Sequence, residues 1–351
     1  MNNLFQFIRL KNHMFSNVIP LKKNEDLNPY ETLRRTYEKE IEKVDQFIKE
    51  KLSSHVELIG EMSSHLMKSG GKRLRPLLTI ASSGLFNYQG DRHIKLAACV
   101  ELIHNATLLH DDVIDKSEFR RGKKTTNNIW GNKNSILAGD YLLSRCFEIM
   151  VEDGSLEVLK LLSSVSSEIA QGEILQLQHE KEIETIEKTY LEIIESKTSS
   201  LFGAAMRVGG CINEKNKNEK EALSSYGINL GICFQITDDI LDYYSYTANF
   251  GKVVGNDFYE GKVTLPIIIL YQKSSEEERI KIKKIFDNEE RSKEELNFIL
   301  SLLTKYNIIA ACKKRAEYFS NVASDALNIF PETKIRKNLQ DLSFYIVNRI
   351  S

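Results

Sequence analysis

The sequence predicts an all-α protein that folds as one large domain, and three observations support this fold class. Only 5 prolines and 18 glycines occur in 351 residues, although these two residue types are the main breakers of helices. Apolar residues recur at three- and four-residue spacing through most of the chain, and no convincing segment shows the alternation of a β-strand. No linker rich in proline, glycine or serine divides the chain, so a single domain is the simplest interpretation.

The expected helices follow one another from residue 30 to the C-terminus. Residues 30–52 carry an amphipathic stripe, and residues 72–85 begin a second helix behind the glycine pair at 70–71. Residues 94–114 are apolar over most of their circumference, which predicts a helix in the centre of the protein. Further helices are expected over residues 135–151, 156–179, 186–208, 221–243 and 266–286, with two or three more over 292–350; the polar runs 213–220 and 274–279 indicate loops.

The composition excludes several classes of function. A net charge of -1 creates no overall field that would attract nucleic acid. The 5 cysteines are scattered without a C-x-x-C pair, which indicates buried thiols in a reducing compartment rather than a zinc site. No apolar run reaches the roughly 18–20 residues that a membrane-spanning helix needs. Contact with a membrane surface stays open.

Residues 1–28 differ from the rest of the chain, and the main domain is expected over residues 29–351. The N-terminal segment holds large apolar residues and four cations, and no acidic residue precedes Glu25. This composition fits a presequence for a mitochondrion or another organelle. A disordered basic tail on a cytoplasmic protein is the alternative.

Asp111, Asp112 and Asp115, the first aspartate motif, lie at the end of the expected central helix. Residues four positions apart share one face of a helix, so Asp111 and Asp115 should project side by side while Asp112 points elsewhere. Adjacent carboxylates there repel one another unless a cation lies between them. Mg²⁺ suits such oxygen-only ligands. Taken alone, the motif is better explained as a solvated helix end.

Asp238, Asp239 and Asp242, the second aspartate motif, repeat the same spacing at the end of an apolar run that starts near Ile228. Two such motifs on buried helices are an improbable coincidence. If the two helices face each other, six carboxylates can hold several Mg²⁺ ions against a diphosphate group. The sequence therefore predicts a site in which metal clamps the substrate.

Cations flank both motifs. Three of them, Lys72, Arg73 and Arg75, follow the glycine pair at 70–71, and the others are Arg120, Arg121, Lys197, Lys252 and Lys262. Arginine suits bidentate phosphate contacts and lysine suits point-charge contacts. In a nearly neutral protein with two candidate metal sites, these cations predict two separate diphosphate pockets.

From about Tyr30 to the C-terminus, the ordered motifs resemble the trans-isoprenyl diphosphate synthase family. They are G-G-K-R-x-R-P, L-L-H-D-D-V-I-D with R-R-G after it, K-T, F-Q-x-x-D-D-x-L-D and G-N-D-x-x-E-G-K. The resemblance implies ten or more helices around a central cavity, the aspartate motifs on opposite walls, and a homodimer. It also implies three Mg²⁺ ions per site and head-to-tail condensation of isopentenyl diphosphate with an allylic prenyl diphosphate.

The resemblance also assigns roles, position by position. The principal Mg²⁺ ligands would be Asp111, Asp115 and Asp238, supported by Asp112, Asp239 and Asp242. The allylic diphosphate would be held by Arg120, Lys197, Lys252 and Lys262. The isopentenyl diphosphate would be held by Lys72, Arg75, His104 and Arg121. Oxygen dipoles near the allylic cation would come from Thr198 and Gln235. The chain departs from the family's pattern at Asn256, where many members carry a second acid.

The expected mechanism is metal-assisted ionisation. Positive charge stabilises the departing diphosphate, the isopentenyl double bond captures the allylic cation, and a proton leaves, plausibly to the released diphosphate. Water must be kept away from the cation. Contact with a membrane surface during product release is left open.

Product length should depend on the residues one turn before Asp111. Ala106 and Thr107 are small there, which predicts a deep tunnel, and Phe147 on the next expected helix is a candidate floor. The same segment is similar to long-chain polyprenyl synthases that make quinone side chains. One alternative is that Ala106 is small only because it packs closely against a neighbouring helix. Another is that the chain is a short-chain synthase that makes farnesyl or geranylgeranyl diphosphate.

Three other classes of protein share part of this pattern. His110-Asp111 is the adjacent pair of metal-dependent phosphohydrolases, whose further ligands would come from His65, His93 and His104, but this leaves the second aspartate motif unexplained. Terpene cyclases generally lack the G-G-K-R-x-R-P cations. Regulatory subunits of heteromeric synthases tend to lose aspartates from one motif, and this chain has lost none.

Overall fold

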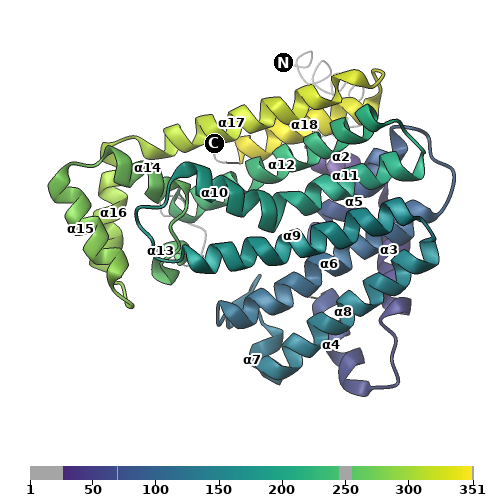
Figure 1. Cartoon of the computed structure of the whole chain (residues 1–351), viewed down its shortest axis with the longest axis horizontal. Helices are drawn as coiled ribbons and strands as arrows, with labels where there is room; N and C mark the ends of the chain where they lie inside the picture. Colours follow the sequence, from purple (N-terminus) through teal and green to yellow (C-terminus); the bar gives the residue numbers. More distant parts are fainter. Residues whose placement is uncertain (1–26, 69, 245–254, 350–351) are drawn as a thin grey trace, which may run out of the picture.

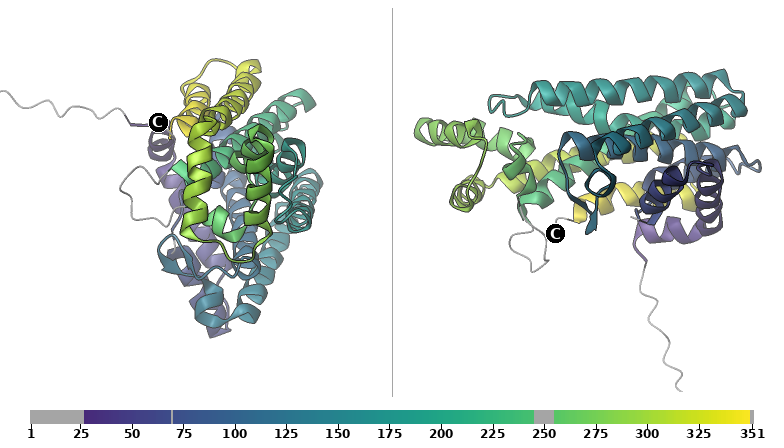
Figure 2. Two further views of the ribbon diagram at one scale, coloured as in Figure 1. Left: turned by 90° about the vertical axis from the view of Figure 1, so that its left-hand side faces the viewer. Right: turned by 90° about the horizontal axis from the view of Figure 1, so that it is seen from below.

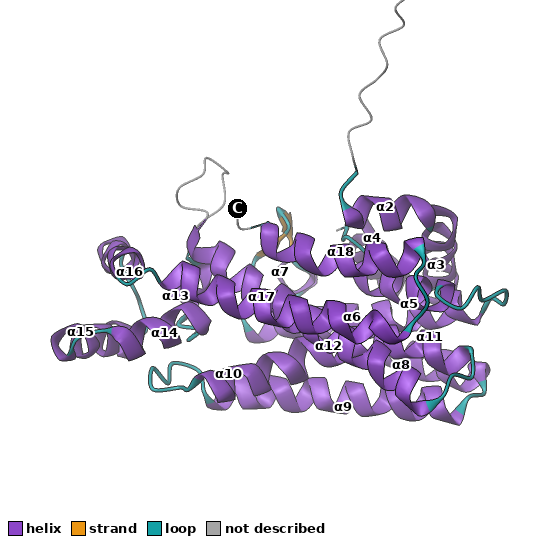
Figure 3. Ribbon diagram, turned by 90° about the horizontal axis from the view of Figure 1, so that it is seen from above, coloured by secondary structure: helices purple, strands orange, loops and turns teal. Residues whose placement is uncertain are grey.

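The computed structural model describes residues 27–68, 70–244 and 255–349, and most of them are helical (Figures 1 and 3). The strands β1 (Phe119–Arg120) and β2 (Lys123–Lys124) pair antiparallel as a small hairpin. The predicted all-α fold is therefore confirmed. No described helix is long and apolar enough to cross a membrane. Most of the expected N-terminal tail, residues 1–26, lies outside the described residues.

The described helices follow in chain order. They are α2 (Pro29–Thr36), α3 (Glu38–Lys51), α4 (Glu57–Lys68), α5 (Leu74–Gly84), α6 (Arg92–Ile114), α7 (Thr126–Trp130), α8 (Asn132–Asp153), α9 (Leu156–Gln178), α10 (Glu187–Ile194), the π-helical turn η1 (Glu195–Ser199), α11 (Ser200–Ile212), α12 (Lys217–Tyr244), α13 (Asn256–Glu260), α14 (Leu265–Lys273), α15 (Glu276–Asp287), α16 (Lys293–Lys305), α17 (Ile308–Ala326), the 3₁₀ turn η3 (Leu327–Ile329) and α18 (Lys334–Asn348).

Most of the expected helices are present, and local chemistry explains where their boundaries differ. The helix expected over 266–286 is two helices, because Ser275 begins α15 with a capping box: its side chain accepts from the Glu278 N–H, and Glu278 accepts from the Ser275 N–H. The helix expected over 30–52 breaks at Tyr37. The helices α4, α7 and α13 were not expected; α7 and α13 have only 5 residues each, too few to show apolar periodicity, whereas α4 has apolar residues at helical spacing that could have predicted it.

The core forms around α6, which packs against α3, α5, α8 and α11 and is buried on several sides, as predicted (Figure 1). A second layer consists of α11, α12 and α17, with α9 beside α11. At one end of the molecule, α15 and α16 project beyond the main bundle (Figures 1 and 2). The bundle therefore places the ends of α6 and α12, which carry the two aspartate motifs, around a shared interior.

The π-helical turn η1 is held closely between α9 and α12 by two glycines. A side chain at Gly172 of α9 would come within 2.7 Å of the Lys197 backbone nitrogen. A side chain at Gly231 of α12 would come within 2.7 Å of the Ser199 Cα. Because neither glycine has a side chain, both helices approach the turn directly and fix the position of Lys197 and Thr198. Wide turns of this kind are frequent at functional sites.

Candidate functional site

A cavity of about 740 Å³ opens between α5, α6, α9, η1, α11 and α12. Its wall contains many of the residues that the sequence singled out. These are Lys72, Arg73, Arg75, His104, Thr107, Asp111, Arg120, Arg121, Lys197, Thr198, Gln235 and Asp238. Residues far apart in the sequence therefore meet at one site, and the expected central cavity exists.

The first aspartate motif distributes its carboxylates as the helical spacing predicted. Asp112 is only 4% exposed and turns away from the cavity to Arg120, whose Nε and guanidinium nitrogen lie 2.9 and 2.7 Å from its Oδ1. Asp111 lies on the cavity wall, and Asp115, directly after α6, accepts from the Lys262 Nζ at 3.0 Å. Of the three carboxylates in this motif, Asp112 is the one that forms an ion pair with a guanidinium.

Asp111 lies in an environment that favours an added positive charge. Burial, together with the nearby carboxylates of Glu173 and Asp115, raises the pKa of its carboxyl to about 7 against the opposing charges of Lys197 and Arg120. A divalent cation at this position would relieve both the burial and the repulsion. The electrostatics of Asp111 therefore fit a metal ligand.

The second aspartate motif separates its side chains more sharply. Asp238 faces the cavity with 41% of its side chain exposed, and the guanidinium of Arg349 lies 3.3 Å away. Asp239 is 4% exposed, and both of its oxygens accept hydrogen bonds, from Gln235 at 2.8 Å and from the Tyr190 hydroxyl at 2.6 Å. Asp242 accepts the Asp257 backbone N–H at 3.0 Å.

The carboxylates of the two aspartate motifs suit Mg²⁺, but they do not form a complete metal site by themselves. In the described part of the chain, no three His, Cys, Asp or Glu side chains converge closely enough to hold a metal ion. Mg²⁺ usually keeps several waters and binds through one or two carboxylates together with substrate phosphates. Asp111, Asp115 and Asp238 offer such carboxylates, so the site suits ions that bind together with a diphosphate.

On the α5 side of the cavity, a neutral histidine and a desolvated arginine face one another. Burial, and then the charge of Arg121, lowers the pKa of Arg75 to about 10, and its guanidinium lies 4.3 Å from the centre of the Phe202 ring. Burial and the neighbouring arginines hold the pKa of His104 well below its usual value, so its imidazole is neutral near pH 7. The pocket thus concentrates positive charge that only an anion can balance.

Arg73 has a different role from its neighbours in the same motif. Its backbone is left-handed (φ 49°), and its guanidinium binds the Glu101 carboxylate at 2.6 Å and the Asp45 carboxylate at 3.0 Å. These ion pairs stabilise a conformation that costs roughly 1–2 kcal/mol for a residue other than glycine. Arg73 therefore anchors the start of α5, and this anchoring directs Lys72 and Arg75 to the cavity.

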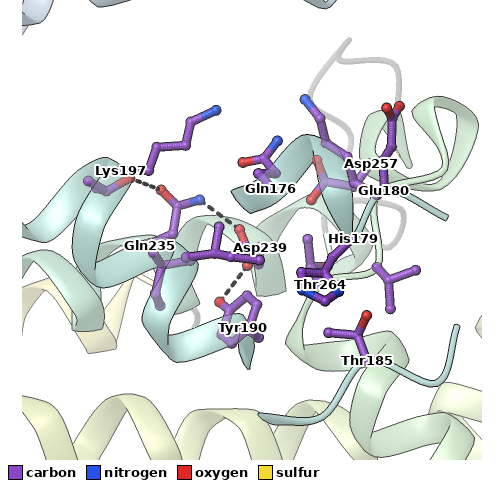
Figure 4. A pocket seen from close by; sticks show the side chains of 15 residues that line it. Gln176, His179, Glu180, Thr185, Tyr190, Lys197, Gln235, Asp239, Asp257 and Thr264 are labelled. Carbon is purple, nitrogen blue, oxygen red and sulfur yellow. Dashed lines mark hydrogen bonds between the residues drawn. The ribbon is translucent and has the colours of Figure 1, made fainter. Parts of the chain in front are cut away.

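The opposite side of the site is built on η1 and the turn after α13. Lys197 pairs with Glu173 at 2.8 Å, and the Thr198 hydroxyl donates to the Gln235 carbonyl oxygen at 3.2 Å. Lys197, Gln235 and Lys262 also line a second cavity of about 150 Å³ next to Asp239 (Figure 4). Lys252, also expected to hold the allylic diphosphate, lies outside the described residues.

The three residues expected to control product length lie in different surroundings. Thr107 is on the wall of the large cavity. Ala106 is fully buried in the core and lines neither of the two cavities, so packing against neighbouring helices accounts for its small size. Phe147 is 50% exposed on α8 and reaches neither cavity, so within this chain it does not form the expected floor.

The sequence alone did not single out three residues of the site: Glu173, Tyr190 and Arg349. Glu173 on α9 binds Lys197, and one of its oxygens is buried without a hydrogen-bond partner in the described residues. Tyr190 lies seven residues before Lys197, a helical spacing that could have drawn attention to it. Arg349 follows α18, and only folding brings it to Asp238 from 111 residues away.

The histidine of the His110-Asp111 pair does not face the site. The His110 ring packs against Gly139 of α8, and its Nε2 lies 3.2 Å from the Ile136 carbonyl oxygen. His65 and His93 pack at T-shaped angles against Trp130 and Tyr88, respectively. These contacts give no support to a phosphohydrolase-type metal centre.

The profile of the polyprenyl synthetase family matches residues 56–303 of the chain. The octaprenyl diphosphate synthase of Haemophilus influenzae is 33% identical over 93% of this chain and 99% of its own length. An all-trans-nonaprenyl diphosphate synthase of Rhodobacter capsulatus is 38% identical over 88% of this chain and 94% of its own length.

Solved structures agree in fold over nearly the whole length. A decaprenyl diphosphate synthase from Rhodobacter capsulatus superposes with a TM-score of 0.88 at 40% identity, covering 92% of this chain and 100% of that one. A polyprenyl synthase from Caulobacter crescentus, solved with calcium and isoprenyl diphosphate, gives a TM-score of 0.87 at 38% identity, covering 92% of this chain and 98% of that one.

Proposed function

Since the chain belongs to the polyprenyl synthetase family and is a prenyltransferase, we propose that it condenses isopentenyl diphosphate head to tail with an allylic prenyl diphosphate. The product is a long all-trans polyprenyl diphosphate, the precursor of a quinone side chain. One observation carries this proposal: a single cavity of about 740 Å³ has Asp111 and Asp238 on its wall together with two separate groups of cations.

Each group of cations receives one substrate in this proposal. Lys197, Lys262 and Arg120 lie near the aspartate motifs and hold the allylic diphosphate, whose departing negative charge they stabilise. The desolvated Arg75, with Lys72, Arg121 and the neutral His104, holds isopentenyl diphosphate. The two substrates then meet inside one cavity, which raises the effective concentration of the double bond at the allylic carbon.

The chain also supplies an environment for the allylic cation. The Thr198 hydroxyl and the Gln235 side chain lie on the cavity wall between the two aspartate motifs, where their oxygen dipoles favour positive charge on the substrate. The aromatic rings of Phe202 and Phe234 line the same wall and help to exclude water. Three Mg²⁺ ions, held by Asp111, Asp115 and Asp238, would add electrostatic stabilisation of the leaving diphosphate when bound.

A long product is consistent with the wall of the cavity at α6. Thr107 leaves this wall without a large side chain one turn before Asp111. Three of the proteins named above are named for products of eight, nine and ten isoprene units. We therefore infer that elongation continues well beyond the farnesyl and geranylgeranyl stage.

Sizing the products tests the proposal directly. The protein is incubated with Mg²⁺, labelled isopentenyl diphosphate and, separately, dimethylallyl, geranyl, farnesyl and geranylgeranyl diphosphate, and the products are separated by reverse-phase chromatography. A dominant product of about eight to ten units is expected. A ladder that stops at three or four units would refute the long-chain assignment, and the absence of any condensation product would refute the reaction itself.

We also propose that two copies of the chain associate through α8. Ile136, Leu137, Phe147 and Val151 share one face of this helix, and each is at least 42% exposed. The four residues form two exposed apolar pairs, one on each side of Asp140 and Ser144, and apolar side chains gathered on one surface indicate a protein contact. In this arrangement Phe147 is covered by the partner subunit rather than by its own chain.

A further inference from the structure

A buried tyrosine supports the second aspartate motif from outside the large cavity. Tyr190 of α10 is 4% exposed, and its hydroxyl donates to the Asp239 Oδ2 at 2.6 Å (Figure 4). The Gln235 amide nitrogen donates to the Asp239 Oδ1 at 2.8 Å, and the Gln235 carbonyl oxygen accepts from the Thr198 hydroxyl at 3.2 Å. These three hydrogen bonds form a chain from Tyr190 to Thr198.

The chemistry of the chain fixes the orientation of the Gln235 amide. The nitrogen of Gln235 donates to the Asp239 Oδ1, so its carbonyl oxygen faces the other way and accepts from the Thr198 hydroxyl. That carbonyl then lies beside Thr198 on the wall of the large cavity. A flipped amide would instead present N–H donors, with partial positive charge, to the place where the allylic cation forms.

Asp239 is poorly placed to act as a metal ligand. Both of its oxygens are bonded to uncharged donors of the chain, and only 4% of the residue is exposed. Asp238, its neighbour in sequence, has 41% of its side chain exposed on the large cavity. Mg²⁺ bound with several waters needs open space of the latter kind. The two adjacent aspartates therefore have different surroundings and different tasks.

We propose that Tyr190 is a positioning residue for the condensation: it holds Asp239, and through Asp239 it keeps the carbonyl oxygen of Gln235 directed toward the ionisation site. This inference rests on the proposed function. Asp239 is a hydrogen-bond anchor in this arrangement and not an Mg²⁺ ligand. Removing the Tyr190 hydroxyl leaves one buried carboxylate oxygen without a donor, and Asp239 and Gln235 lose their fixed orientation.

The test measures chemistry and binding separately. The rate of one condensation is followed under single-turnover conditions with farnesyl diphosphate, and the affinity for inorganic diphosphate with Mg²⁺ is measured by calorimetry. Tyr190→Phe is expected to slow the condensation about tenfold or more, because misoriented groups lose rate rather than binding. Its affinity for Mg²⁺-diphosphate should stay within about twofold of that of the wild type, because no group that binds the anion has changed.

Tyr226→Phe is the matched control. Tyr226 is a fully buried tyrosine of α12 whose hydroxyl donates to the Leu339 carbonyl oxygen, also at 2.6 Å. The control removes an equally short buried hydrogen bond away from both cavities, so it should lower thermal stability and leave the rate unchanged. A rate loss in Tyr226→Phe equal to that in Tyr190→Phe would overturn the positioning role.

Asp239→Asn and Asp238→Asn separate anchoring from metal binding. Asp239→Asn should slow the condensation, leave the affinity for Mg²⁺-diphosphate unchanged, and combine with Tyr190→Phe without a further loss, because both changes break one chain. Asp238→Asn should weaken the affinity about tenfold or more. If Asp239→Asn and Asp238→Asn weaken the affinity for Mg²⁺-diphosphate equally, Asp239 is not a hydrogen-bond anchor. This comparison tests the anchor role even if Tyr190→Phe does not fold.

Two results distinguish the inference from its premise. A wild-type rate in Tyr190→Phe, with an active wild-type enzyme, overturns the positioning role alone. A wild-type protein that forms no product from farnesyl and isopentenyl diphosphate refutes the proposed function, and the positioning role falls with it.

Discussion

At the scale of single residues, identical side chains in one motif have different surroundings. Asp238 faces a cavity, Asp239 is enclosed by two donors, and Asp112 is bound by Arg120. The sequence spacing predicted that the motifs would meet and that Asp112 would point away from Asp111. It did not predict which carboxylates would be enclosed, because the donors Tyr190 and Arg120 come from other elements.

Alanine at Asp111 or Asp238 should remove most of the activity. Each variant is expected to lower turnover by about 10²–10³-fold, the usual cost of losing a preorganised electrostatic contact at the reacting group. The far-UV circular dichroism spectrum should be unchanged, since both side chains lie on a cavity wall. Asp287→Ala, at the exposed end of α15, is the control and should retain full turnover; wild-type turnover in either site variant would contradict the assignment.

Tyrosine at Thr107 should shorten the product. This residue is on the cavity wall, so a phenol there would close the path beside α6, and products should fall to the farnesyl or geranylgeranyl range. Ala106 is fully buried and lines neither cavity, so Ala106→Tyr should leave product length unchanged and lower the unfolding free energy by about 1–3 kcal/mol. Chromatography and thermal unfolding measure the two effects, with Thr107→Val as control. An unchanged product ladder in Thr107→Tyr would refute the tunnel.

At the scale of the elements, most helices were predictable, while the break at Tyr37 and the π-helical turn η1 were not. Apolar spacing identified α6, α8, α9 and α12 because each buries a continuous face. The S-x-x-E pattern at Ser275 indicates a capping box and hence a helix start, but the apolar run before it favoured a single helix over 266–286. The π-helical turn has no such signal, because it depends on Gly172 and Gly231 in other helices.

Gly172→Ala should disturb the π-helical turn. The added methyl group would lie 2.7 Å from the Lys197 backbone nitrogen, so η1 must shift, which should cost about 1–3 kcal/mol of unfolding free energy and about tenfold or more in turnover. Gly60→Ala is the matched control in α4, where nothing lies within 4 Å, and should stabilise the protein by up to about 1 kcal/mol. Denaturant titration and turnover measure both; normal turnover in Gly172→Ala would contradict this role for the turn.

At the scale of the whole molecule, one exposed apolar face of α8 is not covered by any of the residues that the structure describes. Charge composition and helical spacing could not distinguish this face from the buried ones, since both carry leucine and isoleucine at the same spacing. Only the packed structure shows which apolar stripe is left over. In the expected homodimer, a second copy of the chain would cover this face.

Leu137→Asp should convert the dimer to a monomer. Leu137 is 63% exposed in the isolated chain, so a charge there is harmless to the fold but costly once buried against a second copy. Ile280→Asp on α15 changes a residue that is also 63% exposed, away from this face, and should leave the mass unchanged. Light scattering after size-exclusion chromatography reports the mass, and a dimer that survives Leu137→Asp would exclude α8 as the interface.

The ion pairs of the site have a thermodynamic consequence. Lys197, Lys262 and Arg349, which lie where anionic groups are expected, are each paired with a carboxylate of the same site. A diphosphate that draws a lysine away uncovers a carboxylate, and that carboxylate then attracts a divalent ion more strongly. By thermodynamic linkage, bound metal must increase the affinity for diphosphate by the same factor by which bound diphosphate increases the affinity for metal. Each is expected to bind weakly alone and tightly together.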